Sequence, residues 1–439
     1  FGLNSTFLSV NLLNRTVGGG DNFTGVLTDN NGNVIVGQHI ALNLTRLSNG
    51  LSKVYWVTTD TNGEFQLAIN LGVGNYSALC NYYGNSKYAS SSNFTSIIVN
   101  NPLPMFSVLG ASKDLVINSS DSIQDAINNA NEGSTIFLSS GVYNQSGIVV
   151  NKSLSFVGLD NVTINANRNG SCFIIYDNYE VLFSNLTFIN GFNDYGGAID
   201  NFKGIITICD CIFINNSAEN NGGSVNTYTG RDTILNSIFV NNTAKNDGGA
   251  VANGNLSKSY IGGCYFLNNY AHAWGGAVYS WLTNVTVSDN SFYNNSAGDS
   301  GGALITYGVS KIFNNSFVNN YARMGGAISV DEVYSFFLTG VTCNYNYFVN
   351  NSDSYRGTDV NIVKASLSSN FDDNWWGVNN PLNSTVYPIS FSSRWWDPGN
   401  YIANITSWLN METSVNGSTL TVNMVSSSGN NKTTNIPLF

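Results

Sequence analysis

The chain has 439 residues, of which 42% are apolar and 10% are charged, and its formal net charge is −10. A disordered acidic chain would carry more charge and fewer apolar residues, and a nucleic-acid-binding protein would carry an excess of Lys and Arg. The composition therefore excludes both classes, and the length leaves room for about two or three domains.

Residues 1–100 alternate short apolar runs with Asn-Gly turns, which predicts about seven strands and an antiparallel β-sandwich. Three runs, at 24–29, 58–65 and 74–78, resemble the immunoglobulin-like modules of surface adhesins. The Cys-Trp-Cys core of antibody domains is missing, so this resemblance implies only the general sandwich. Residues 101–112, which contain Asn-Pro-Leu-Pro, are expected to be a linker.

An amphipathic helix is predicted over 121–131, near the start of a domain that extends over 113–397. Its apolar residues share one helical face, at Ile123, Ala126, Ile127 and Ala130. Asp121 and Gln124 match a capping box, and Gly133 ends the helix. We expect the helix to cover the first coil of the repeat that follows and to shield its strand edge.

One unit recurs between Phe188 and Asn351. It contains a Gly-Gly pair that opens a short apolar strand, at 196, 222, 248, 275, 301 and 325, so the period is 24 to 27 residues. It also contains a Phe-x-Asn-Asn motif, at Phe213, Phe239, Phe266, Phe292, Phe317 and Phe348. The apolar runs are short and rich in Val, Ile and Phe, which indicates strands rather than helices.

Coils of this length cannot bury an apolar face alone, so they must stack about 4.8 Å apart with their strands paired in parallel. The repeat therefore predicts a right-handed parallel β-helix of roughly ten coils. Stacking places Phe on Phe in the core and Asn on Asn at a bend, where side-chain amides can form a hydrogen-bonded ladder. Asn and Gly also tolerate the left-handed backbone that a sharp bend needs.

The two motifs resemble the repeat of the chlamydial polymorphic outer-membrane proteins and, more closely, that of adhesin-like surface proteins of methanogenic archaea. The resemblance covers about 120–380 and departs at both ends, since Phe188 is followed by Ile-Asn-Gly and 31 residues separate Phe317 from Phe348. Terminal coils are expected to be atypical. The helix predicted at 121–131 also resembles the one that opens pectin-lyase-like β-helices, which implies that type of fold.

Two aromatic segments stand near the end of this domain, Asn-Trp-Trp-Gly at 374–377 and Arg-Trp-Trp-Asp at 394–397. Each is interpreted as a bulky plug on the last coil, with a stacking platform for sugars as the alternative. Residues 398–439 are expected to form an incomplete β-sandwich of about two or three strands, which cannot bury its own core.

We expect a neighbouring copy to complete this sandwich with its residues 1–13, an apolar strand-like run. Because such a contact joins two different surfaces, it would propagate head to tail into a filament. The residues expected in the contact are Phe1, Leu3, Phe7, Leu8, Val10, Leu12, Leu420, Val422 and Met424. The alternative is that the chain was cut from a longer one with more modules.

Asn accounts for 71 residues, and 23 of them begin Asn-x-Ser/Thr sequons, which favours an exported, N-glycosylated protein. Glycans are expected at bends and in the sandwiches, at Asn4, Asn14, Asn22, Asn43, Asn75, Asn93, Asn144, Asn169, Asn255, Asn284, Asn383, Asn404, Asn416 and Asn431. Poor occupancy is expected where the sequon meets a ladder or a strand, at Asn215, Asn241, Asn294, Asn314 and Asn350.

The chain has no initiator Met, signal peptide or apolar run of 18 residues, which predicts a mature or excised chain whose anchor lies outside it. Buried free thiols and disulfides both fit the six cysteines, Cys80, Cys172, Cys209, Cys211, Cys264 and Cys343. None of them has zinc-type spacing with His39 or His272.

Polysaccharide lyases and hydrolases also use this fold, so carboxylates deserve a test as catalytic or Ca²⁺-binding groups. The candidate acids are Asp200, Asp210, Asp232, Asp289, Asp331, Glu332, Asp372 and Asp373, and the candidate bases are Arg231, Arg323 and Arg356. They share no repeat phase that would gather them on one face. Three further acids, Asp194, Asp247 and Asp299, are expected to share the phase before Gly-Gly, where Asp is an ordinary turn residue.

The sequence thus predicts an all-β, non-enzymatic, extracellular adhesin-like protein of an archaeal cell surface, with no catalytic, cofactor or metal site. Its expected partners are further copies of itself and the glycans of cell surfaces or other cells, and no nucleic acid or membrane span is expected. The alternatives are a carbohydrate-active β-helix enzyme, with Ca²⁺ as its possible cofactor, and a carbohydrate-binding stalk.

Overall fold

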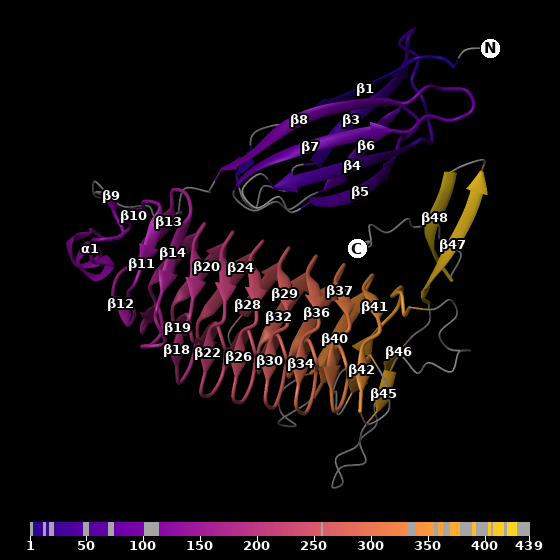
Figure 1. Ribbon diagram of the computed structural model, residues 1–439. Helices are drawn as coiled ribbons and strands as arrows, with labels where there is room; N and C mark the ends of the chain where they lie inside the picture. Colours follow the sequence, from indigo (N-terminus) through magenta and orange to yellow (C-terminus); the bar gives the residue numbers. More distant parts are fainter. Residues whose placement is uncertain are drawn as a thin grey trace. The chain divides into compact units, whose positions relative to one another are not determined.

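The computed structural model in Figure 1 describes residues 3–11, 15–16, 22–46, 52–68, 74–100, 114–255, 258–331, 339–354, 359–362, 369–377, 389–391, 403–404, 407–416 and 419–427. These residues belong to two compact units, one within 1–106 and the other within 107–436. No helix in these ranges is long and apolar enough to cross a membrane.

The first unit is a sandwich of two sheets with one core between them. One sheet consists of β1 (Thr6–Asn11), β3 (Asn22–Asp29) and β6 (Glu64–Ala68). The other consists of β2 (Arg15–Thr16), β8 (Ser91–Asn100), β7 (Gly74–Tyr82), β4 (His39–Arg46) and β5 (Ser52–Thr58). Leu27 and Phe65 of the first sheet share a buried cluster with Leu42 and Ala78 of the second. The two-sheet sandwich agrees with the sequence, and its immunoglobulin-like type stays a prediction.

The strand expected to leave this sandwich is already paired within it. β1 runs antiparallel to β3, with Thr6 opposite Asp29 and Asn11 opposite Thr24. Its Leu8 side chain is buried in the core of the sandwich. Donating residues 1–13 to a neighbour would therefore require breaking this pairing and exposing Leu8.

The second unit is a parallel β-helix with four sheets along its length, each named here after one strand. The β20 sheet contains β9 (Leu115–Ile117), β10 (Thr135–Leu138), β13 (Leu154–Gly158), β16 (Glu180–Ser184), β20 (Ile205–Cys209), β24 (Arg231–Leu235), β28 (Lys258–Gly262), β32 (Asn284–Ser288), β36 (Val309–Phe313), β40 (Gly340–Asn344), β44 (Ser369–Asn370) and β46 (Ala403–Asn404). The β21 sheet contains β11 (Gly141–Tyr143), β14 (Val162–Asn165), β17 (Thr187–Ile189), β21 (Ile212–Ile214), β25 (Ile238–Val240), β29 (Tyr265–Leu267), β33 (Ser291–Tyr293), β37 (Ser316–Val318) and β41 (Tyr347–Val349).

After each strand of the β21 sheet from β17 onward, the chain forms a two-residue strand of a third sheet, the β22 sheet, and then a strand of a fourth sheet, the β19 sheet, which completes the coil. This β22 sheet contains β18 (Phe192–Asn193), β22 (Ser217–Ala218), β26 (Thr243–Ala244), β30 (Tyr270–Ala271), β34 (Ser296–Ala297), β38 (Tyr321–Ala322) and β42 (Ser352–Asp353). The β19 sheet contains β12 (Ile148–Val150), β15 (Phe173–Ile175), β19 (Ile199–Phe202), β23 (Val225–Tyr228), β27 (Val251–Gly254), β31 (Val278–Trp281), β35 (Leu304–Thr306), β39 (Ile328–Val330), β43 (Val360–Ile362) and β45 (Ile389–Phe391). The predicted β-helix and its 24- to 27-residue period are confirmed.

A column of stacked aromatic rings runs through the core, as the repeat predicts. Phe239 is fully buried, and its ring centroid lies 4.7 Å from that of Phe213 and 4.8 Å from that of Phe266. Trp376 ends the column, 4.6 Å from Phe348 and nearly parallel to it. The interpretation of 374–377 as a plug is therefore confirmed, and 394–397 lies outside the described residues.

The two Asn of Phe-x-Asn-Asn have opposite roles at the bend between the β21 and β22 sheets. The first, such as Asn241 with φ 54°, is left-handed and, apart from the half-buried Asn319, exposed. The second is buried and forms the predicted ladder. Asn242 donates from its side-chain amide to Oδ1 of Asn269 at 3.0 Å and to the Phe213 carbonyl at 3.1 Å. Both donors of each buried amide are thus used, as burial of a polar group requires.

The bend between the β20 and β21 sheets uses the same design with more varied residues. Its left-handed position is filled by Asn185, Asp210, Asn236, Gly263, Asp289, Asn314, Tyr345 and Asp373. Behind it, Cys264 donates its backbone N–H to Oδ1 of Asn290 at 2.8 Å, and Cys211 donates to the Ser237 hydroxyl at 3.1 Å. Cys and Ser thus replace Asn in the early coils, and all six cysteines are buried free thiols.

The Gly-Gly pairs combine two different requirements. The first glycine is left-handed, with φ 65° at Gly248. A Cβ on the second, Gly249, would lie 2.1 Å from the carbonyl oxygen of Gly276 in the next coil. The first glycine is therefore needed for its positive φ, and the second allows the close approach of neighbouring coils.

The capping helix is α1 (Ile123–Asn129), shorter than predicted by two residues at each end. Its N-cap is Ser122, whose hydroxyl accepts from the Asp125 N–H at 3.1 Å, so the capping box assigned to Asp121 is wrong. Gln124 accepts from Val149 N–H at 2.8 Å and donates to Val149 O at 3.1 Å. The helix therefore satisfies the open edge of β12, as expected for a cap.

One short strand, β46, continues the parallel pairing beyond residue 398, where the sequence predicts a domain boundary. β45 pairs in parallel with β43, and β46 pairs with β44. The next strands, β47 (Leu409–Asn416) and β48 (Thr419–Ser426), form an antiparallel hairpin. Its first residue, Leu409, donates its N–H to Asn374 O at 3.0 Å and is buried against Trp375. Within the described residues, the segment after 398 is thus attached to the last coil.

Candidate functional site: a groove on the outer face of the β22 sheet

The outer face of the β22 sheet presents one side chain per coil in a single row. Parallel register places Phe192 beside Ser217, Ser217 beside Thr243, and Thr243 beside Tyr270. The row continues with Ser296, Tyr321 and Ser352. Because the coils stack in register, a small residue in this row leaves a depression in the outer face between the larger residues of neighbouring coils.

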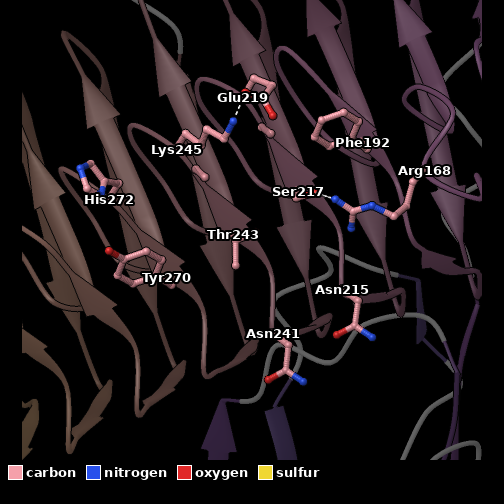
Figure 2. A pocket seen from close by; sticks show the side chains of 12 residues that line it. Arg168, Phe192, Asn215, Ser217, Glu219, Asn241, Thr243, Lys245, Tyr270 and His272 are labelled. Carbon is pink, nitrogen blue, oxygen red and sulfur yellow. Dashed lines mark hydrogen bonds and ion pairs between the residues drawn. The ribbon is translucent and has the colours of Figure 1, made fainter.

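A groove of about 530 Å³ lies where two small residues follow each other in the row. Ser217 and Thr243 form its floor, between the ring of Phe192 and the ring of Tyr270 (Figure 2). These two aromatic residues stand three coils apart, which corresponds to about 14 Å at the usual strand spacing. Tyr270 is 41% exposed, so its ring is available to a ligand.

Charged side chains lie along one rim of the groove (Figure 2). Arg168 lies over the Phe192 ring, 5.1 Å from its centroid, and donates to the Ser217 hydroxyl at 3.4 Å. Lys245 forms an ion pair with Glu219 in the neighbouring coil. The opposing charges of that pair compensate each other, so the rim offers hydrogen bonds rather than a strong field.

The opposite rim consists of the exposed asparagines Asn215 and Asn241, which point the same way in Figure 2. They are the left-handed residues of the bend, and their amides project outward because the second Asn of each pair occupies the interior. His272 and Tyr270 add an imidazole and a phenol at the far end of the groove. The lining thus combines ring faces with hydroxyl and amide groups.

The candidate catalytic acids are placed by the structure at several separate positions. Asp210, Asp289 and Asp373 take the left-handed position of the bend before the β21 sheet, with φ between 55° and 59°. Asp232 points into the interior, and Asp200 accepts from the Asn226 amide at 3.2 Å on the β19 sheet. Asp331 is buried, and Asp372 accepts from the Ser407 N–H at 3.0 Å.

The candidate bases are not gathered with these acids. Arg231 is exposed, and Arg323 donates to Asp299 at 2.6 Å on the outer surface. Glu332 and Arg356 lie outside the described residues. Within the described ranges, no group of three His, Cys, Asp or Glu residues is placed to hold a metal ion.

The prediction that Asp194, Asp247 and Asp299 share one phase is wrong. Asp194 and Asp299 stand two residues before their Gly pairs, whereas Asp247 stands directly before Gly248. The backbone hydrogen bonds between coils show the same difference. The Gly222 N–H donates to Asp247 O, whereas the Asn220 N–H donates to Asp194 O. Asp247 is 7% exposed, while Asp299 is more open and binds Arg323.

Buried carboxyl groups predict a pH-dependent stability. Burial raises the pKa of Asp232, Asp247 and Asp359 to about 7, and nearby Asp353 adds to the effect at Asp359. Because the folded pKa exceeds the unfolded one, their stabilising contribution is complete below the unfolded pKa and is lost as pH rises through about 7. We expect the free energy of unfolding, measured by urea titration, to fall by several kcal/mol between pH 5 and pH 8.

Asp232→Asn provides the control for this pH dependence, since it keeps the shape of the side chain and removes its titration. We expect the variant to show a shallower decline between pH 5 and pH 8 than the parent protein. A parent protein that becomes more stable as pH rises would contradict the prediction, as would an unchanged slope in the variant.

The sequons fall into two structural classes. Asn215, Asn241, Asn294 and Asn350 begin the Asn pairs and are exposed, so the assumption that they lie inside the ladder is wrong. By contrast, Asn93 donates its amide to Leu8 O at 2.8 Å. Exposed side chains occur at Asn4, Asn144, Asn169 and Asn284, and half-buried ones at Asn43, Asn255 and Asn314. The structure does not describe residues Asn14, Asn383 and Asn431, or the side chains of Asn22, Asn75, Asn404 and Asn416.

The residues expected in an assembly contact are partly described. Leu3 and Phe7 are exposed, Val10 is half-buried and Leu8 is buried. Leu420, Val422 and Met424 lie on β48, while Phe1 and Leu12 fall outside the described residues.

Comparisons with known proteins agree with the repeat. The model of the Chlamydia polymorphic membrane protein repeat matches residues 263–280, which contain one Phe-x-Asn-Asn and one Gly-Gly-Ala-Val motif. No curated protein sequence matches the chain. A solved structure, the family 28 exopolygalacturonase of Yersinia enterocolitica, is similar with a TM-score of 0.37 and 8% identity, over 92% of this chain and 99% of that chain. The chain thus contains a repeat of the polymorphic membrane protein type, and the likeness to the exopolygalacturonase is too distant to assign an activity.

Proposed function

We propose that this chain is a non-enzymatic, adhesin-like protein of a cell surface, in which the β-helix is a rigid support for outward-facing side chains. The observation that carries the proposal is the continuous column of rings and amides that links each coil to the next. Such contacts between neighbours favour an extended solenoid surface, a form that proteins use for binding. The match to a repeat of membrane-surface proteins at 263–280 supports the same function.

The positions of the acids also support a structural function. Asp210, Asp289 and Asp373 occupy a bend position that Asn, Gly and Tyr fill in other coils. The backbone conformation explains why Asp occurs at a position that Asn and Gly fill in other coils, since Asp, Asn and Gly tolerate positive φ. The archaeal origin implied by the repeat resemblance belongs to this proposal as well.

Two measurements test the function. Antibodies to the β-helix should label intact cells of the source organism, and beads coated with the purified chain should adhere to cells or to immobilised glycans. Uncoated beads and beads carrying only the first unit are the controls. Absence of both labelling and adhesion would overturn the proposal. Release of unsaturated or reducing ends from pectins or cell-wall glycans, with or without Ca²⁺, would favour the enzyme instead.

Glycan occupancy gives a separate prediction for the exported protein. We expect mass spectrometry of the chain purified from its own source to find glycans at Asn294 and Asn350, whose side chains are exposed. We expect none at Asn93 or Asn185, whose amide nitrogens donate to backbone carbonyls at 2.8 Å and 2.7 Å. Glycans at Asn93 and Asn185 without any at Asn294 and Asn350 would contradict this assignment.

Assembly by donation of residues 1–13 is not part of the proposal. β1 is paired with β3 along six residues, and its Leu8 is buried in the same sandwich. Self-association of the chain stays a prediction, which light scattering of the purified chain would check.

A further inference from the structure

We propose that the groove between Phe192 and Tyr270 binds a chain of pyranose sugars. This inference rests on the proposed adhesin-like function and names its ligand class. The exposed Tyr270 ring stands on one side of a floor formed by Ser217 and Thr243, and the Phe192 ring, with the Arg168 guanidinium over it, stands on the other (Figure 2). Aromatic rings offer flat apolar surfaces, and the apolar face of a sugar ring stacks on such a surface while its hydroxyls meet polar groups around it.

The polar groups of the groove match a polyhydroxylated ligand. Asn215 and Asn241 each offer a carbonyl acceptor and an NH₂ donor, and the Thr243 hydroxyl can both donate and accept. The charged residues are engaged locally, since Lys245 pairs with Glu219 and Arg168 lies over Phe192. The lining therefore offers many neutral hydrogen bonds together with the positive charge of Arg168, since Glu219 is already paired with Lys245.

The length of the groove sets the size of the ligand. Three coil spacings separate Phe192 from Tyr270, about 14 Å, so the groove accommodates more than one sugar ring along the row. Beyond Tyr270, a single small residue, Ser296, precedes Tyr321 and leaves only a narrow notch. An extended oligosaccharide aligned with the row is thus favoured over a single sugar.

A peptide is a weaker fit to the same surface. Peptides commonly bind by adding a strand to an open sheet edge. Here β22 and β26 are each paired with a neighbouring strand on both sides, through β18, through each other and through β30. The groove lies on the face of the sheet and offers side chains, which suits a sugar chain rather than a strand.

The test uses the full chain made in a host without Asn-linked glycosylation, because Asn215 and Asn241 begin sequons and a glycan there would fill the groove. The proposal therefore requires Asn215 and Asn241 of the native protein to carry no glycan. The probes are hexasaccharides of cellulose, chitin, mannan and polygalacturonate, and binding is measured by isothermal titration and by ligand-observed NMR. We expect at least one probe to bind. Thr243→Tyr, which fills the floor, should weaken binding at least about tenfold.

Matched variants separate the groove from the fold. Ser352→Tyr makes the same kind of change in the same row, three coils from Tyr270, and should leave binding unchanged. Tyr270→Ser removes one ring and places there the residue that the row already has at Ser217 and Ser296, so it should fold and bind about tenfold more weakly. If Thr243→Tyr loses thermal stability, its weaker binding no longer tests the groove, and the binding measured for Tyr270→Ser decides.

The outcomes distinguish this inference from the proposed function. Binding of no probe, or equal binding by the parent chain and Tyr270→Ser, overturns the sugar groove and leaves the adhesin-like function to its own tests. Sugar binding that depends on Tyr270, together with absence from the cell surface and failure of coated beads to adhere, supports the groove and counts against the adhesin-like function.

Discussion

Asn269→Asp should destabilise the β-helix by at least about 3 kcal/mol at pH 8. The buried Asn269 amide donates to Phe239 O at 3.0 Å and to Oδ1 of Asn295 at 2.9 Å. A carboxylate would turn this donor into a charged acceptor that faces two oxygens in a site with no exposed surface. Urea unfolding followed by far-ultraviolet circular dichroism measures the change in the free energy of unfolding.

Asn268→Asp is the matched control, since it makes the same chemical change one residue away. Asn268 is exposed and left-handed, with φ 55°, and Asp takes the equivalent conformation at Asp289 with φ 59°. We expect a change below about 0.5 kcal/mol there, as for other exposed substitutions. Equal losses in the two variants would show that the second Asn of the motif does not form the ladder.

Phe239→Ala should destabilise the protein by about 3 to 5 kcal/mol. The ring is fully buried and stacks on Phe213 and Phe266, with interplanar angles of 2° and 6°. Its removal leaves a cavity between two rings that the paired strands on either side prevent from closing. The midpoint of urea unfolding, with its slope, gives the change in stability.

Tyr321→Ala removes an aromatic ring of similar size from the outer surface, where Tyr321 is 48% exposed. This variant should lose less than about 1 kcal/mol. If Phe239→Ala lost no more than Tyr321→Ala, the motif Phe would not lie in the core and the phase of the repeat would be wrong.

The fold was predictable from sequence wherever one residue type repeats at one position. Phe213 and Phe239 are stacked because only a large apolar ring fills that site in each coil, so identity and position coincide. The bend between the β20 and β21 sheets was not recognised from the sequence, because the property that its residues share is a positive φ. Asn236, Gly263, Asp289 and Tyr345 share that property without sharing a side chain.

The roles of the paired asparagines could not be separated by pattern alone. Both members of Asn241-Asn242 recur in six successive coils, and Asn suits a left-handed bend as well as an amide ladder. Only the path of the backbone decides that Asn241 turns outward while Asn242 turns in. The premise of the glycosylation prediction for Asn241, that its amide lies in the ladder, was wrong for the same reason.

The groove could not be found from sequence because it depends on a register rather than on a motif. Ser217, Thr243 and Tyr270 each directly follow the Asn pair of a repeat, but the residue type at this place differs from coil to coil. They become neighbours only when the two-residue strands of successive coils are aligned. Strands were expected after residue 398, but the pairing of β46 with β44 was not, since β46 is two residues long and carries no repeat motif.

The ladder also determines how such a chain can change its length in evolution. Ladder partners Asn242 and Asn269 are 27 residues apart, whereas Asn320 and Asn351 are 31 apart and still make the same bond at 2.8 Å. The extra residues fall between β39 and β40, so insertions are accommodated at this corner without disturbing the column. Duplication or loss of a whole repeat would leave every surviving coil with equivalent neighbours, and the solenoid would lengthen or shorten by about 4.8 Å at each event. Related genes should therefore differ by whole repeats and by insertions at this one corner.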